Sequence, residues 1–209
     1  MARALKGCVI ACGLALVGGL AAGTQTPVEA QTAQMFSVQV SGLGNKLFGD
    51  EFVGIETGFG FEAQIRYNPS AFSVGGGFQY TSHGVDIASS GVVFPPGTEI
   101  TTTLTGVFVE PRYVIDMQHD NVAPYVSARF SLSDITLTGA APGLPEVEVS
   151  DTGFTANAGG GILYRLSPRA NLDFGATFGI KTLNYDDTQP TATGTNLIFR
   201  VGVAFGLGG

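Results

Sequence analysis

The stretch Ile55-Glu56-Thr57-Gly58-Phe59-Gly60-Phe61-Glu62-Ala63-Gln64-Ile65-Arg66-Tyr67 alternates between two kinds of side chain at successive positions. The odd-numbered positions are apolar or aromatic, apart from Thr57, and the even-numbered positions are charged, amide or glycine. Side chains of a β-strand point to opposite faces in turn, so this period of two predicts a strand with one apolar and one polar face.

The same alternation recurs about eight times after residue 31. The predicted strands cover residues 36–42, 55–67, 72–81, 105–113, 125–132, 154–165, 172–181 and 196–205. The gaps between them are alternately long (around 45–53, 83–100, 134–151 and 183–193) and short (68–70, 116–121 and 167–170). Short periplasmic turns and longer extracellular loops are typical of barrels in an outer membrane. The sequence therefore predicts an all-β fold, an eight-stranded antiparallel up-and-down transmembrane β-barrel with both termini in the periplasm.

Composition favours a barrel in lipid over a soluble one. Charged residues make up 13% of the chain, whereas a soluble surface alone usually carries about 25–35%. A soluble lipocalin-like barrel is the structural alternative, and its apolar stripe would point inward. The polar stripe here is mostly Gly, Ser, Thr, Asn and Gln, which suits a narrow lumen better than a solvated exterior. We therefore expect the apolar stripe to face lipid.

The first thirty residues have the pattern of a secretory signal peptide. Arg3 and Lys6 precede an apolar run over residues 7–22, and small residues flank a cleavage point before Gln31. We predict a signal peptide over residues 1–30 and an outer-membrane β-barrel domain over residues 31–209. Both cysteines lie in the predicted signal peptide, so the mature chain has no thiol for a disulfide, a metal site or thiolate catalysis.

Charged residues recur on the polar face of the predicted strands. The predicted lumen charge network comprises Glu62, Arg66, Glu110, Arg112, Arg129, Arg165, Asp173, Lys181 and Arg200. An eight-stranded barrel is only wide enough for side chains to fill it, and buried charges must be paired. The first interpretation is a structural, salt-bridged plug. The alternative is an anion-selective constriction in a small passive pore.

Three residues depart from the expected strand pattern. Pro111 lies inside a strand and cannot donate to the hydrogen-bond ladder, so we expect a bulge or a strand end there. Phe108 and Leu163 fall on the polar face, where we expect them to fill the lumen.

The last predicted strand carries a short assembly motif. The motif consists of a polar residue, any residue, glycine, any two residues, an apolar residue, any residue and a second apolar residue. Its defined positions in this chain are Arg200, Gly202, Phe205 and Leu207. With the segments 111–113 and 164–168, it resembles the small OmpA/OmpX-like outer membrane protein β-barrel domain family, although Gly208 and Gly209 follow the motif. The resemblance implies recognition by the barrel-assembly machinery and a bacterial outer-membrane location after signal-peptide cleavage. It also implies contact with outer-membrane lipid and lipopolysaccharide.

The presumed extracellular loops are acidic. Their carboxylates are Asp50, Glu51, Asp86, Glu99, Asp134, Glu146, Glu148, Asp151, Asp186 and Asp187, against Lys46 alone. We predict a non-enzymatic, monomeric barrel with a structural or adhesion-like surface-interaction role, its contact surface being residues 83–100 and 134–151. A partner for these loops cannot be named from the sequence. A second hypothesis is that Mg²⁺ or Ca²⁺ bridges these carboxylates to lipopolysaccharide phosphates.

An enzyme that modifies lipid A is the less favoured alternative. Such an enzyme would need a nucleophile and a base within hydrogen-bond reach. His119 falls in a periplasmic turn, and His83, beside Thr81 and Ser82 at the outer rim, is expected to be a solvated strand end. Phosphate-binding loops and basic nucleic-acid patches are absent from the sequence. We therefore predict no catalytic residues, no cofactor, no metal and no nucleic-acid partner.

Overall fold

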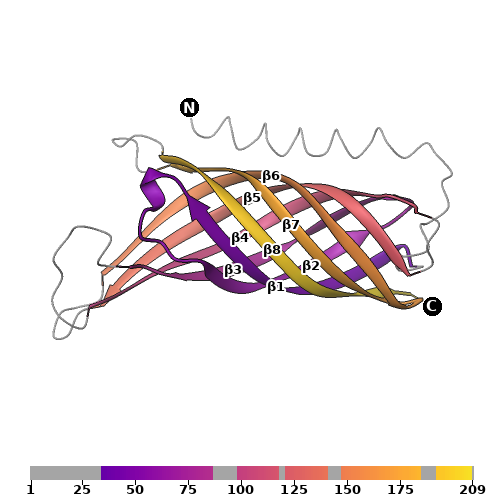
Figure 1. The fold of residues 1–209 in the computed structure, drawn as a ribbon. Coiled ribbons are helices and arrows are strands. Elements are labelled where there is room, and N and C mark those ends of the chain that lie inside the picture. Colours follow the sequence, from indigo (N-terminus) through magenta and orange to yellow (C-terminus); the bar gives the residue numbers. More distant parts are fainter. Residues whose placement is uncertain (1–33, 87–97, 118–120, 141–146, 185–191, 209) are drawn as a thin grey trace, which may run out of the picture.

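The computed structural model describes residues 34–86, 98–117, 121–140, 147–184 and 192–208. Eight strands form a closed barrel in which each strand is antiparallel to both neighbours, and β8 pairs with β1 (Figure 1). This confirms the predicted fold. The strands are β1 (Phe36–Phe48), β2 (Gly58–Tyr67), β3 (Phe72–Gly84), β4 (Glu99–Val114), β5 (Val122–Ala140), β6 (Val147–Ser167), β7 (Ala170–Asn184) and β8 (Ala192–Leu207).

The two faces of each strand have opposite chemistry, as the alternation predicts. In β2 the side chains of Glu62 and Arg66 are buried in the lumen, whereas Phe59 and Phe61 are exposed on the outside. A soluble lipocalin-like barrel would show the reverse, so that alternative is wrong. The polar side chains fill the inside of the barrel, and the outside carries the apolar ones that a bilayer requires.

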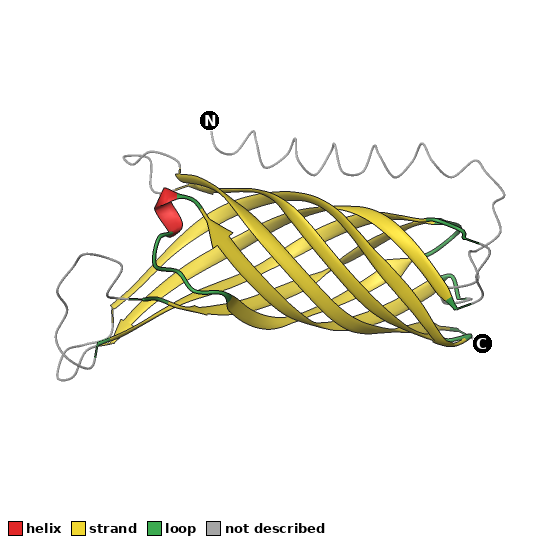
Figure 2. Ribbon diagram, viewed as in Figure 1, coloured by secondary structure: helices red, strands yellow, loops and turns green. Residues whose placement is uncertain are grey.

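The two ends of the barrel differ. At the end that holds the C-terminus, β6 and β7 are joined only through residues 168–169. At the opposite, extracellular end lies a 3-10 turn, η1 (Asp50–Phe52), between β1 and β2 (Figure 2). In the described part of the chain, no helix has the length and apolar character needed to cross a membrane.

The predicted extracellular loop over 134–151 is wrong in large part. β5 continues to Ala140 and β6 begins at Val147, and the two strands pair from Gly139↔Val147 downward. Together with the start of β4 they reach beyond the other strands at the extracellular end (Figure 1). The alternation continues there, but the apolar and polar faces are exchanged. A strand prediction that requires apolar residues on the same face throughout therefore ends the strand too early.

Pro111 produces neither the expected bulge nor a strand end. It lies within β4 and pairs with Val74 of β3. On its other side the ladder to β5 skips two residues, between Val109↔Phe130 and Arg112↔Ser127, without a shift in register. The missing N–H therefore interrupts the ladder locally, because the strand is held in register on both sides of it.

Candidate functional site

Glu110 of β4 is the centre of a buried network of charged side chains in the lumen. Its carboxylate is fully buried and contacts guanidinium groups from four strands. The N···O distances are 3.1 Å to Arg66, 3.0 Å to Arg112, 3.6 Å to Arg129 and 2.7 Å to Arg200. One carboxylate thus holds strands β2, β4, β5 and β8 together through the barrel axis.

Two further carboxylates complete the network. Glu62 accepts a hydrogen bond from Arg129 at 2.6 Å and lies 3.5 Å from Arg200. Asp173 accepts one from Arg112 at 2.8 Å and another from Gln39 at 2.8 Å. Both are fully buried, and an unpaired charge at such a place would be costly. Each carboxylate therefore stabilises several arginines at once.

Two aromatic rings support the arginines. The Tyr125 hydroxyl donates to Asp173 at 2.6 Å and accepts from Arg200 at 3.0 Å, while its ring lies 3.9 Å from the Arg112 guanidinium carbon. Phe108 lies beneath the guanidinium group of Arg129, at 3.7 Å. Such cation–π contacts stabilise a desolvated guanidinium group. Phe108 fills the lumen as expected, and it also supports a charge.

Tyr125 is a functional residue that the sequence analysis missed. The sequence feature that could have indicated it is an aromatic side chain at a polar-face position of a predicted strand. A Cβ at Gly161 or Gly175 would collide with its hydroxyl. Glycines on β6 and β7 therefore make the room that lets this ring reach the network.

The structure brings together seven of the nine predicted network residues, and the other two lie apart. Lys181 is buried towards the extracellular side, where its ammonium donates to the Ser133 hydroxyl at 3.2 Å and pairs with no described carboxylate. Arg165 is half-buried at the periplasmic rim, beside a register shift between Arg165 and Ser167. On the same face of β6, Leu163 occupies the next inward position, so Arg165 is separated from the network.

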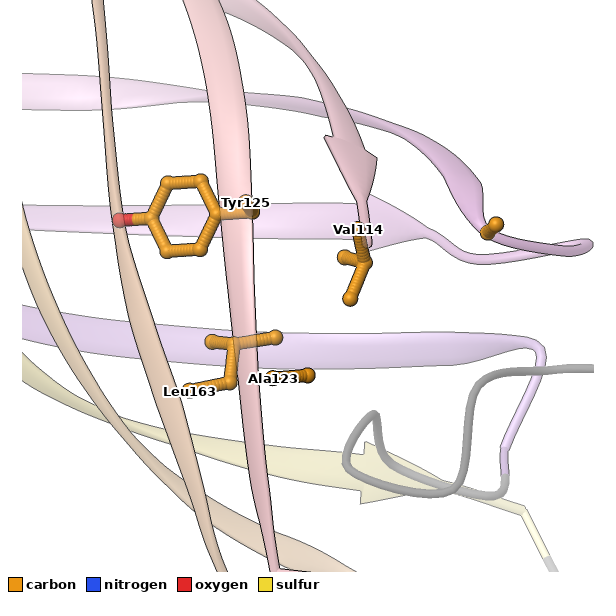
Figure 3. Close-up of a cluster of buried hydrophobic side chains, with 5 residues drawn as sticks. Val114, Ala123, Tyr125 and Leu163 are labelled. Carbon is orange, nitrogen blue, oxygen red and sulfur yellow. The ribbon is translucent and has the colours of Figure 1, made fainter. Parts of the chain in front are cut away.

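An apolar cluster lines the periplasmic side of the lumen. It comprises Ala71, Val114, Ala123, Tyr125 and Leu163. In Figure 3 the Tyr125 hydroxyl points away from the other members. Tyr125 therefore belongs both to the apolar cluster, through its ring, and to the charge network, through its hydroxyl.

Two small hollows border the charge network. A cavity of about 20 Å³ lies at the periplasmic end, between Arg66, Arg112 and the polar side chains around them. A second hollow, beside Arg129 and Arg200, is too small for a water molecule. The side chains of the network therefore fill the centre of the barrel.

The extracellular mouth is covered by the β1–β2 connection, which we call the cap (residues 49–56). Phe52 of η1 is buried against Leu47 and Leu183. Lys46 donates to the carbonyl of Ile55 at 3.2 Å, and the Asp86 amide donates to the Gly54 carbonyl at 2.7 Å. The cap is therefore anchored both to β1 and to the end of β3.

His83 is not the solvated strand end that was expected. Its ring is fully buried, with Nδ1 3.0 Å from the Glu56 carbonyl of the cap and Nε2 3.2 Å from the Thr81 hydroxyl. The cap continues alongside the end of β3 through the bridge between Ile55 and Val85. His119 lies outside the described residues.

The extended parts of β4, β5 and β6 form a second candidate site, which we call the raised ribbon (residues 99–105, 134–140 and 147–152). Its outer face is polar in the three rows above the rim. From the rim upward, the cross-strand rows are Thr105–Asp134–Thr152, Thr103–Thr136–Ser150 and Thr101–Thr138–Glu148. The next row toward the periplasm, Val107–Leu132–Phe154, is apolar. The change between these rows marks the outer boundary of the lipid-facing band.

The inner face of the raised ribbon is largely apolar. Its rows are Leu104–Ile135–Asp151, Thr102–Leu137–Val149 and Ile100–Gly139–Val147. Leu137, Val147 and Val149 are exposed to 41%, 61% and 52%. The pairing of β6 with β7 begins only at Thr152↔Asn184, so no described residue pairs with the far edge of Val147–Asp151.

The described residues hold no group of three or more His, Cys, Asp or Glu side chains placed to bind a metal ion. The hypothesis of a Mg²⁺ or Ca²⁺ bridge also involves Glu146, Asp186 and Asp187, which lie outside the described residues.

A sequence model of the family described as "Outer membrane protein beta-barrel domain" matches residues 12–205. The chain belongs to this family. Membership gives the protein a bacterial outer-membrane location, in agreement with its polar lumen and apolar exterior. No curated protein matches the sequence.

Several solved structures share the fold. Neisserial surface protein A is 20% identical with a TM-score of 0.56, and the match covers 82% of this chain and 97% of that chain. Ail, the attachment invasion locus protein of Yersinia pestis, is 16% identical with a TM-score of 0.49, covering 81% and 96%. OprG from Pseudomonas aeruginosa is 11% identical with a TM-score of 0.46, covering 85% and 98%. At such identities the first likeness shows the fold alone, and the other two carry no argument about function.

The predicted assembly motif lies at the seam that closes the barrel. Phe205 and Leu207 are exposed on the outer face of β8, opposite Val38 and Phe36 of β1. Arg200, by contrast, points into the lumen, where it belongs to the charge network.

Proposed function

We propose that this protein is a closed, non-enzymatic and monomeric outer-membrane barrel that presents the raised ribbon for contact with another protein. The observation that carries the proposal is the exchange of faces above the rim. Three strands leave the bilayer and turn an apolar inner face toward the barrel mouth, where Leu137, Val147 and Val149 are exposed. An exposed apolar surface of this kind is typical of a contact site.

The edge of β6 over Val147–Asp151, with which no described residue pairs, indicates how a partner would bind. An extended segment can add to an unpaired strand edge through main-chain hydrogen bonds, and its alternate side chains then decide specificity. Here Val147 and Val149 would lie beside apolar side chains of the added strand. Glu148, between them, would lie beside the intervening position.

Charge complementarity defines the partner further. The sequence from residue 84 to 111 and from 130 to 164 contains no Lys, Arg or His. It does contain Asp134, Glu148 and Asp151, which lie on the raised ribbon. We therefore propose a partner segment that alternates apolar and basic residues. The proposal keeps the adhesion-like role predicted for the acidic loops. It assigns the contact surface to the edge of a strand instead of to the loops.

A test uses the full chain in lipid nanodiscs and synthetic eight-residue peptides that alternate valine with lysine or with glutamate. We expect the Val/Lys peptide to bind and the Val/Glu peptide not to bind. The double variant Val147→Lys and Val149→Lys should lose binding, because inward-facing charges block strand addition. Its matched control, Thr101→Lys and Thr103→Lys, places the same two charges on the outer face of the ribbon, two strands away from the β6 edge, and should retain binding.

Two results would contradict the proposal. One is equal binding of both peptides, since charge and alternation would then have no role. The other is equal loss of binding in the two double variants, which would indicate non-specific attraction to the acidic surface.

The non-enzymatic part of the proposal is supported by the environment of the described histidine. The His83 ring is fully buried between the Glu56 carbonyl and the Thr81 hydroxyl, so a substrate has no access to it. We also propose that the assembly motif of Arg200, Gly202, Phe205 and Leu207 is read by the barrel-assembly machinery, and that the outer surface contacts lipid and lipopolysaccharide.

A further inference from the structure

The charge network has one more cation than it has carboxylates. Four guanidinium groups (Arg66, Arg112, Arg129 and Arg200) meet three carboxylates (Glu62, Glu110 and Asp173), which leaves 4 − 3 = +1. Those three are the only buried acidic side chains among the described residues. Because an uncompensated buried charge is costly, the network favours a further negative charge close by.

The two arginines on the periplasmic side have unused donors. Arg66 donates from Nη1 to Ser73 and to the Glu110 carbonyl, and from Nη2 to Gln64 and the Glu110 carboxylate. Its Nε has no hydrogen-bond acceptor in the described structure, and the same holds for the Nε atoms of Arg112, Arg129 and Arg200. Of these four side chains, Arg66 and Arg112 line the periplasmic cavity. Both side chains are at least nine-tenths buried.

A cavity borders these same two side chains. It has a volume of about 20 Å³, enough for roughly one water-sized particle. Besides Arg66 and Arg112, its polar lining is Ser37, Gln39, Asn68, Ser73 and Asn171, and no carboxylate borders it. The excess positive charge therefore lies beside this cavity.

Two hydroxyl groups can add donors to this cavity. Ser37 already accepts a hydrogen bond from the Asn68 amide at 3.0 Å, and Ser73 accepts one from Arg66 at 3.2 Å. Each hydroxyl oxygen is thus occupied as an acceptor, which leaves its hydrogen available to donate. Two guanidinium N–H groups and two O–H groups form a donor set suited to an anion.

We propose that this cavity is a binding site for one small monovalent inorganic anion, of which chloride is the physiological example. The anion neutralises the excess charge and uses donors that the carboxylates leave free. A bound water molecule is the competing occupant, because water would also satisfy the unpaired oxygen of Asn171. The two differ in a measurable way, since water occupancy does not depend on the halide concentration.

The first experiment measures the thermal unfolding of the full chain in detergent micelles at constant ionic strength, with sodium chloride replaced stepwise by sodium gluconate. Gluconate is too large for the cavity. We expect a saturable rise of the unfolding midpoint, about 3–6 °C at a chloride concentration ten times the dissociation constant. Equal midpoints in the two salts would overturn the proposal.

The site is assigned with a pair of double variants. Ser37→Ala with Ser73→Ala removes both hydroxyl donors and should reduce the chloride-dependent rise at least twofold. Ser127→Ala with Ser131→Ala removes two other buried lumen hydroxyls, which have no hydrogen-bond partner among the described residues and do not border the cavity. This control should keep the full rise, and an equal reduction in both variants would contradict the assignment.

A second measurement does not depend on the variants. Crystals of the wild-type chain grown in sodium bromide should show anomalous scattering in the cavity between Arg66 and Arg112. Density without an anomalous signal would identify water and overturn the proposal. This result is independent of peptide binding at the raised ribbon, which lies at the other end of the barrel.

Discussion

In the barrel body the inward face carries charges and hydrogen-bonding groups and the outward face carries apolar side chains, whereas the raised ribbon has these roles exchanged. Both regions belong to the same strands. On β5, Arg129 points inward and Phe130 outward, while Leu137 is inward and Thr136 outward. The alternation defines a strand in both regions, and the surrounding medium decides which face can be apolar.

The exchange has a physical cause at the rim. Below it the outside of the barrel is in hydrocarbon, and the narrow lumen must hold its polar groups in mutual contact. Above it the outside is in water. On the inner face Ile135 still packs against the cap, but Leu137, Val147 and Val149 farther out are exposed and have no facing polar groups among the described residues. A network like that around Glu110 is therefore possible only in the closed part of the barrel.

The largest effect is expected from removing the centre of the network. Glu110→Gln leaves four arginines with two carboxylates and should lower the free energy of unfolding by about 3–5 kcal/mol or prevent assembly. Urea unfolding in lipid vesicles and the gel mobility of unboiled samples measure this. Asp151→Asn, on the raised ribbon, is the control and should change stability by less than about 0.5 kcal/mol. A Glu110→Gln protein as stable as wild type would show that the network is not a structural plug.

The boundary between the two regions can be tested with one substitution at two heights. Phe130→Arg places a charge on the lipid-facing band and should cost about 2–4 kcal/mol. Thr136→Arg, on the same face of the same strand, lies above the rim and should cost about 0–1 kcal/mol. The readout is urea unfolding in lipid vesicles. Equal costs would place the bilayer boundary elsewhere on β5.

The cap, which separates the two regions at the mouth, can be weakened locally. Lys46→Met removes the hydrogen bond to the Ile55 carbonyl, a change worth about 0.5–1.5 kcal/mol. We expect faster hydrogen exchange at the Ile55 amide, which is bonded to the Phe52 carbonyl, with little change in global stability. Unchanged exchange at Ile55 would mean that Phe52 and the bridge to β3 alone hold the cap.

The last prediction concerns ion conductance through the barrel, and we expect none. The network fills the lumen and the cap covers its mouth, so planar-bilayer recordings of the wild-type chain should show no steady current. Steady openings whose size changes in Arg129→Gln would support the passive-pore alternative instead.

The sequence predicted the barrel body better than the ribbon for a specific reason. The strand prediction from alternation assumes that the apolar side chains of a strand stay on one face. This holds only within the height of the bilayer. It therefore ended β5 at Leu132 and began β6 at Phe154, where the outer face changes character. The same alternation placed Tyr125 on the polar face like any other residue there. It shows which face of a strand a residue occupies, but nothing about the contacts of its side chain.

The sequence alone determined the strand number, their antiparallel order and which face is wet in the membrane, because alternation and gap length are local properties of the chain. Only the tertiary structure decided which charges meet. Glu110 contacts Arg66 and Arg200, which are 44 and 90 residues away in sequence. Their heights in the lumen depend on the register of all eight strands around the closed barrel. That closure also separated Arg165 and Lys181 from the network, although their positions in the alternation pattern are equivalent to those of its members.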